Sequence, residues 1–287
     1  MTNPTHSDPV PAIRESDAVG STAEIFADIR ETLNVDVVNL IWRHMATLPG
    51  ALEWIWESLK PLYQGPALSR ATFVRNNLAL PLVPAFSRDV LSVVGIDDAA
   101  LTSVRRILDS YQHTNALALV CFSAFLVRFG GSTPQQVSTT GDNTDKVTGA
   151  TAARARLPRL IPLADMTPEL ARLVQELNEF GEDSAPDLVA SMYRHLAHWP
   201  AYLALVRTLL IPFHRSGELK SIVAGARTFG EELGAQMASD ISTTPPYPEF
   251  EHILDAIRRF VRHPIARMTG VCSIIRMATP ELPSRLV

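Results

Sequence analysis

The sequence contains few of the residues and motifs that build the most familiar structural and catalytic sites. Only two of its 287 residues are cysteines, Cys121 and Cys272, and both lie in apolar stretches. They exclude a disulfide framework and a zinc site of the CxxC type, and we expect both to be buried as small apolar side chains. Glycine-rich nucleotide loops, GxSxG, HExxH and EF-hand loops are also absent from the sequence. We therefore expect neither a cofactor nor a metal site.

The chain also lacks long apolar runs and an excess of one charge. Its longest nearly apolar run, from Ala116 to Val127, is shorter than the roughly 20 residues that a membrane-spanning helix needs. With 26 basic and 30 acidic residues, nothing predicts binding to nucleic acid or to a membrane. The N-terminal residues form no signal peptide. We expect a cytoplasmic protein with a small-molecule partner, and a homodimer is compatible with this expectation.

What the chain does have is apolar residues at helical spacing, beginning with Ile25, Phe26, Ile29 and Leu33. The sustained alternation of apolar and polar residues that is typical of strands is missing. The fold class is therefore predicted to be all-α. After the first helix, the spacing predicts helices over residues 37–48, 51–63, 68–78, 86–94, 97–110 and 115–129.

The two halves of the chain resemble each other. Residues 36–49 align with residues 187–200 at a constant separation of 151 positions, from Asp36 to Asp187. At the same separation, Arg43-His44 falls on Arg194-His195, and Val120-Cys121 falls on Val271-Cys272. We infer two tandem helical repeats of about 130 residues that form a single-chain pseudo-dimer with a pseudo-two-fold axis. The predicted organisation is a flexible tail (1–22), repeat 1 (23–130), a linker (131–160) and repeat 2 (161–287), with a site between the repeats.

A few polar residues at the edges of apolar helices are candidates for that site. Ser191 and His195 share one helix face, and Asn115 opens an apolar run. As alternatives, Asn115 caps a helix and Ser191 bonds back to its own helix backbone. His113 is a candidate general base. The pair His195 and His198 has no acidic or cysteine partner nearby, so a metal site is not expected there.

Other features are open to a purely structural explanation. Tyr111, Trp42 and Tyr193 supply either aromatic cavity walls or ordinary core residues. The repeated Arg-His pair, at Arg43 and at Arg194, is more easily explained by helix packing than by one asymmetric site.

Several segments carry a resemblance to a known family: DIRETL, IDDAALTSVRRIL, IPLAD and the LAxWP core that ends at Pro200. In these the chain resembles the cofactor-independent, all-α DL-2-haloacid dehalogenases (the DehI-like family). The resemblance implies two tandem helical repeats with the site between them. It also implies direct hydrolysis, in which an aspartate activates a water that displaces halide from the α-carbon without a covalent intermediate.

The chain departs from this pattern at the base. The family's aspartate falls on Met192, which accepts no proton, whereas its serine and asparagine fall on Ser191 and Asn115. The family's tyrosine falls on His113, and its substrate-facing Trp and Phe fall on Val37 and Leu40. The resemblance therefore predicts a rebuilt, larger and more apolar pocket.

Three functions follow from this comparison. The first is a repurposed cyclase, isomerase, lyase or hydrolase of specialised metabolism that acts on a larger substrate without a cofactor. The second is a hydrolytic 2-haloacid dehalogenase with a relocated base, His113 or His195. The third is a non-catalytic binding protein. In the first two, the predicted catalytic residues are Asn115, His113 and His195, and the predicted substrate-binding residues are Ser191, Met192, Val37, Leu40, Tyr111 and Trp42.

Overall fold

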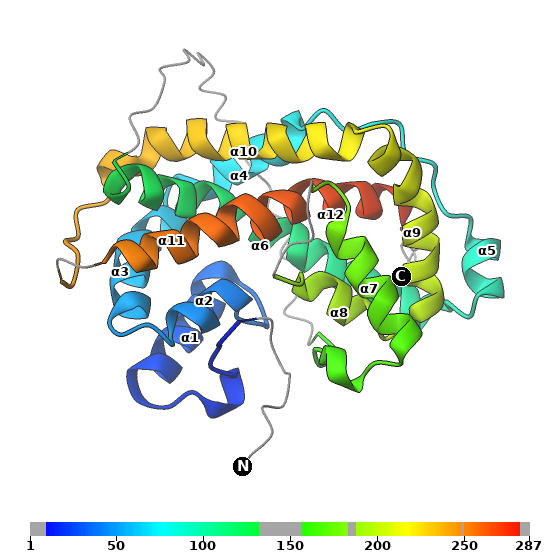
Figure 1. Cartoon of the computed structure of the whole chain (residues 1–287), viewed down its shortest axis with the longest axis horizontal. Helices are drawn as coiled ribbons and strands as arrows, with labels where there is room; N and C mark the ends of the chain where they lie inside the picture. Colours follow the sequence, from blue (N-terminus) through cyan, green and yellow to red (C-terminus); the bar gives the residue numbers. More distant parts are fainter. Residues whose placement is uncertain (1–9, 132–156, 183–187, 248–249, 282–287) are drawn as a thin grey trace, which may run out of the picture.

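A computed structural model of the chain describes residues 10–131, 157–182, 188–247 and 250–281, and this part contains helices and no strand (Figure 1). The predicted all-α fold class is confirmed. The α-helices are α1 (Gly20–Leu33), α2 (Leu40–Met45), α3 (Ala51–Gln64), α4 (Ala67–Asn77), α5 (Arg88–Val93), α6 (Asp98–Phe129), α7 (Pro168–Glu179), α8 (Ser191–Leu196), α9 (Pro200–Arg215), α10 (Glu218–Met237), α11 (Glu251–Phe260) and α12 (Ala266–Ala278). A π-helical turn, Val261–Ile265, joins α11 to α12.

The long helix α6 replaces two predicted helices. It runs for 32 residues without a break, because no glycine or proline lies between residues 98 and 129. Asp97 caps its first turn by accepting a hydrogen bond from the amide of Ala100. Asn115 lies in the middle of the helix, so the alternative that it caps a helix is wrong.

The beginning of the described chain packs against the first half of the molecule. The amide of Ile13 donates to the carbonyl of Arg43 at 3.0 Å, and Glu15 forms an ion pair with Arg30 at 2.6 Å. Residues 10–22 therefore differ from the flexible tail that the sequence predicts, since these bonds fix them to α1 and α2. Residues 1–9 of that tail and most of the predicted linker lie outside the described residues.

The apolar core consists of two clusters, and α6 belongs to both. Its C-terminal half packs with α1 to α4 and α11, and its N-terminal half packs with α7 to α9 and α12. Figure 1 shows α6, α10 and the α11–α12 run extending across the molecule between these two ends. Helix α10 also contributes to both clusters, so each cluster contains helices from both halves of the chain.

The helix positions are compatible with a duplication. Helices α2 and α8 are both six residues long and start 151 residues apart, at Leu40 and Ser191, and α4 and α10 start at the same separation. The tandem repeat and its domain boundaries stay a prediction. Among the described helices, none is long and apolar enough to span a membrane.

Candidate functional site

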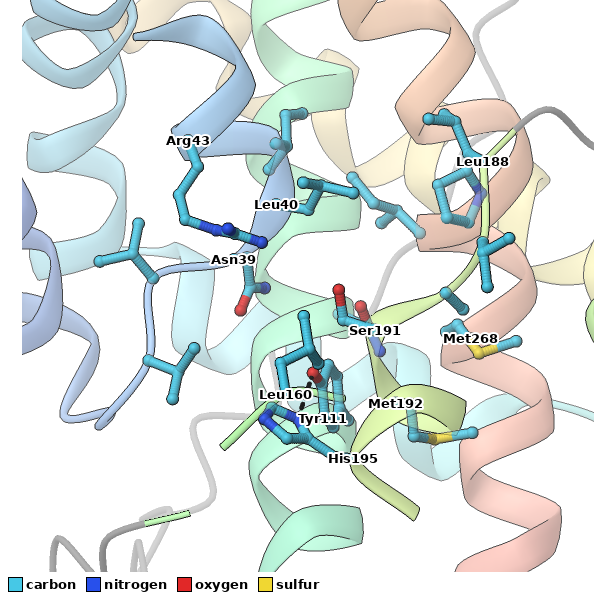
Figure 2. Close-up of a pocket in the computed structure, with 18 of the residues that line it drawn as sticks. Asn39, Leu40, Arg43, Tyr111, Leu160, Leu188, Ser191, Met192, His195 and Met268 are labelled. Carbon is cyan, nitrogen blue, oxygen red and sulfur yellow. Dashed lines mark hydrogen bonds between the residues drawn. The ribbon is translucent and has the colours of Figure 1, made fainter. Parts of the chain in front are cut away.

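A cavity of about 60 Å³ lies where α2, α6, α8 and the α11–α12 junction meet (Figure 2). Its walls are mostly apolar and include Val37, Leu40, Met192 and Met268. The π-helical turn with Pro264 forms part of one wall; such turns are frequent at functional sites. Seven described residues with polar side chains also line the cavity: Asn39, Arg43, Ser110, Tyr111, Asn115, Ser191 and His195.

Helical spacing brings these polar side chains to one place. Tyr111 and Asn115 are four residues apart on α6, so they share one face of that helix. Ser191 and His195 have the same relation on α8. Because α6 and α8 approach each other at the cavity, the two pairs face a common space, as the sequence pattern predicts for Ser191 and His195.

A tyrosine and a histidine form a buried hydrogen-bonded pair in this cavity. The hydroxyl of Tyr111 lies 2.8 Å from Nδ1 of His195, whose side chain is 1% exposed. Burial lowers the pKa of His195 to about 3, and the positive charges of Arg194 and Arg43 and the nearby His198 act in the same direction. Burial raises the pKa of Tyr111. Both groups are therefore neutral at neutral pH.

Two other polar groups in the wall have unused hydrogen-bonding capacity. The amide nitrogen Nδ2 of Asn115 and the hydroxyl of Ser191 are buried, and neither has a hydrogen-bond partner among the described residues. Ser191 therefore does not make the backbone bond that the sequence leaves as an alternative. Since buried polar groups are nearly always paired in folded proteins, these two atoms are suited to a bound ligand or water.

Two predicted site residues lie elsewhere. His113 is two residues from Tyr111 on α6, about 200° around the helix, so it points away from the cavity. Its Nε2 donates to the carbonyl of Leu33 at 3.1 Å, and burial lowers its pKa. Trp42 packs in the core, with its ring 4.9 Å from that of Phe122. The structure therefore does not bring His113 and Trp42 to the cavity.

The cavity wall also includes polar residues that were not predicted for the site from the sequence. Arg43 is buried in the wall and lies three residues after Leu40 on α2. Asn39 precedes the same helix. Arg43 is four residues after Asn39 and three after Leu40, and this spacing could have indicated that Arg43 points to the same side as these two residues. Among the described residues that line the cavity, none is an aspartate or a glutamate.

A buried amide holds the backbone that leads into α8. The Asn178 side chain donates to the carbonyl of Leu188 at 3.0 Å and accepts from the amide of Ala190 at 2.9 Å. Arg267, which is fully buried, donates to the Oδ1 atom of Asn178 at 2.7 Å and also to its carbonyl. This network positions the backbone immediately before Ser191.

We expect Asn178→Leu to lower the free energy of unfolding by about 2–4 kcal/mol. The leucine leaves the Leu188 carbonyl and the Ala190 amide buried without partners. Asn178→Asp is the matched control, because it keeps an acceptor for Ala190 and for Arg267, and we expect a smaller loss. Urea unfolding followed by circular dichroism measures both. Equal stability of Asn178→Leu and the native protein would contradict this role.

The low pKa of His195 predicts a pH dependence of stability. The folded state holds His195 neutral down to about pH 3, whereas the unfolded chain takes up the proton near pH 6.5. The free energy of unfolding is therefore unaffected by this titration above pH 6.5. Below pH 6.5 it falls by about 1.4 kcal/mol per pH unit, because the unfolded chain binds a proton that the folded protein does not. We expect His195→Gln to gain stability relative to the native protein between pH 7 and pH 5 in urea unfolding. A constant difference would show that His195 titrates normally.

The chain is similar in sequence to two 2-haloacid dehalogenases. No family model matches the chain. The chain is 30% identical over 112 residues to an (R)-2-haloacid dehalogenase of Pseudomonas putida, a match that spans 37% of each protein. It is 28% identical over 219 residues to a configuration-inverting 2-haloacid dehalogenase of Alcaligenes xylosoxydans xylosoxydans, covering 72% of this chain and 69% of the relative.

Solved structures agree over nearly the whole chain. A D-2-haloacid dehalogenase mutant in complex with D-2-CPA matches with a TM-score of 0.66 and 15% identity, over 97% of this chain and 98% of that one. A D-2-haloacid dehalogenase in complex with L-LA matches with a TM-score of 0.65 over the same shares. The chain thus has the all-α fold of the D-2-haloacid dehalogenases and is similar in sequence to 2-haloacid dehalogenases.

Proposed function

We propose that the protein is a hydrolytic enzyme of the 2-haloacid dehalogenase type, which displaces the C2 halide of a small acid by water. The observation that carries the proposal is the Tyr111–His195 pair, which shares a small apolar cavity with the unpaired polar atoms of Asn115 and Ser191. The sequence similarity to two 2-haloacid dehalogenases supports the same reaction.

The size of the cavity favours a small substrate. The cavity has a volume of about 60 Å³, whereas one water molecule needs about 10–15 Å³. The cavity therefore fits a molecule with few non-hydrogen atoms. The sequence predicts a larger substrate of specialised metabolism, because Val37 and Leu40 align with aromatic residues of the family that the chain resembles. Both line the cavity, yet the space beside them is small, which weighs against that function.

The base in this proposal is His195, acting through Tyr111. The water oxygen attacks C2, and the halide leaves with the electron pair of its bond to carbon. The water proton passes to the Tyr111 oxygen while Tyr111 gives its own proton to Nδ1 of His195, which then returns it to solvent. A pKa of about 3 is close to that of an ordinary aspartate, about 3.9. His195 is therefore unprotonated at neutral pH and able to accept a proton there.

The second candidate function is non-catalytic binding of a small acid. The observation that favours it is the lack of any carboxylate among the described residues of the cavity wall. Under this alternative, methionine at position 192 replaces the family's base, and no other residue of the cavity acts as a base.

Halide release from D- and L-2-chloropropionate and from bromoacetate tests the proposal. We expect release by the native protein. If the native protein releases no halide but Met192→Asp does, the binding function is favoured, since the cavity then admits the acid and lacks only a base. If neither protein releases halide, and thermal unfolding shows that both are folded, the proposed function is contradicted.

A further inference from the structure

The cavity wall contains a buried arginine that the proposed reaction does not use. Arg43 is 8% exposed, and it is the only Arg or Lys among the described lining residues. Figure 2 shows its guanidinium extending from α2 toward Asn39 and toward the side on which Ser191 lies. With five N–H donors, a guanidinium holds a protein group and still offers donors to a ligand.

The counterpart of Arg43 in the second half of the chain has a different environment. Arg194 lies 151 residues later on α8 and is also buried. Its Nε donates to the carbonyl of Ile161 at 3.0 Å, and it does not line the cavity. Packing of a repeated motif therefore does not by itself explain why Arg43 faces the cavity.

The charge of Arg43 acts on the polar pair in the cavity. Its positive charge lowers the pKa of Tyr111 and contributes to the low pKa of His195. An anion bound beside Arg43 therefore lies within electrostatic range of the groups proposed to take the proton. The unpaired donor Nδ2 of Asn115 and the unpaired hydroxyl of Ser191 line the same space.

We propose that Arg43 binds the carboxylate of the substrate and makes the cavity selective for carboxylate anions over neutral molecules of the same shape. Bidentate hydrogen bonding between guanidinium and carboxylate gives both the affinity and a fixed orientation. Asn115 and Ser191 complete the polar end of the site. Identification of the anion as a substrate rests on the proposed function, whereas the anion selectivity does not.

Titration calorimetry with propionate and with propionamide tests the inference, because both lack a leaving group and need no turnover. We expect the native protein to bind propionate at least about tenfold more tightly than propionamide, the range that a hydrogen bond to a charged group supplies. Arg43→Met should abolish this ratio and Arg43→Lys should reduce it, since a lysine keeps the charge without the two-pronged geometry. Arg194→Lys is the matched control, with the ratio unchanged.

Two results would overturn the inference. One is equal binding of acid and amide by the native protein, and the other is an unchanged ratio in Arg43→Lys. If Arg43→Met fails to fold, these two measurements still decide. Acid selectivity that depends on Arg43, in a protein that releases no halide, would remove the proposed function and keep the inference. Halide release by the native protein, together with an unchanged ratio of propionate to propionamide affinity in Arg43→Lys, would keep the proposed function and overturn the inference.

Discussion

Replacement of Gly234 by alanine is expected to lower the free energy of unfolding by about 3 kcal/mol or more. Gly234 lies on α10 where that helix crosses α6, and a Cβ there would lie 2.6 Å from the amide nitrogen of Ala124 and 2.7 Å from Cβ of Ser123. Backbone atoms of a buried helix do not move aside locally, so α10 and α6 would have to separate.

Gly225→Ala is the matched control for this prediction. Gly225 is on the same helix, and a Cβ there meets no atom within 4 Å. Because alanine is a better helix former than glycine, we expect this variant to gain up to about 1 kcal/mol. Urea unfolding followed by circular dichroism measures both variants. Similar changes in the two would show that α10 and α6 are not in close contact at Gly234.

The largest expected effect on activity is that of His195→Gln. The proposed mechanism predicts a fall in kcat of about 10²–10⁴ on 2-chloropropionate, the usual contribution of a general base. Tyr111→Phe breaks the same proton path, so the double variant should be little worse than either single one. Halide release at saturating substrate measures all three.

His113→Ala is the control for the histidine prediction. His113 bonds the carbonyl of Leu33 and lies outside the cavity wall. We expect an unchanged kcat for the folded protein, with some loss of stability. A large fall in kcat for His113→Ala, with little change for His195→Gln, would show that the wrong histidine has been assigned as base.

Apolar spacing predicted the helical fold well and failed at one informative place. The polar residues between Tyr111 and Asn115 resemble a break between two helices, yet α6 continues through them. Tyr111 and Asn115 are polar groups that face the cavity, and His113 between them bonds the carbonyl of Leu33, the last residue of α1. A helix with polar groups on several sides gives no clear period in the sequence.

Two features of the sequence predicted part of the candidate site: a shared helix face and the family resemblance. The four-residue spacing of Ser191 and His195 indicated a common face, and the family resemblance indicated Asn115, Val37 and Leu40. The repeated Arg-His pair led to a packing interpretation of Arg43, because the sequence does not show that its two copies have different neighbours. Cavity volume depends on how helices from both halves pack, so it could not be predicted.

A crystal structure of His195→Gln with L-2-chloropropionate tests the central claim most directly, because the variant should turn the acid over slowly enough to trap it. We predict electron density for the acid in this cavity, with its carboxylate on Arg43 and its C2 atom facing Tyr111. An empty cavity at a saturating concentration of the acid, or an acid bound at another place, would contradict the account.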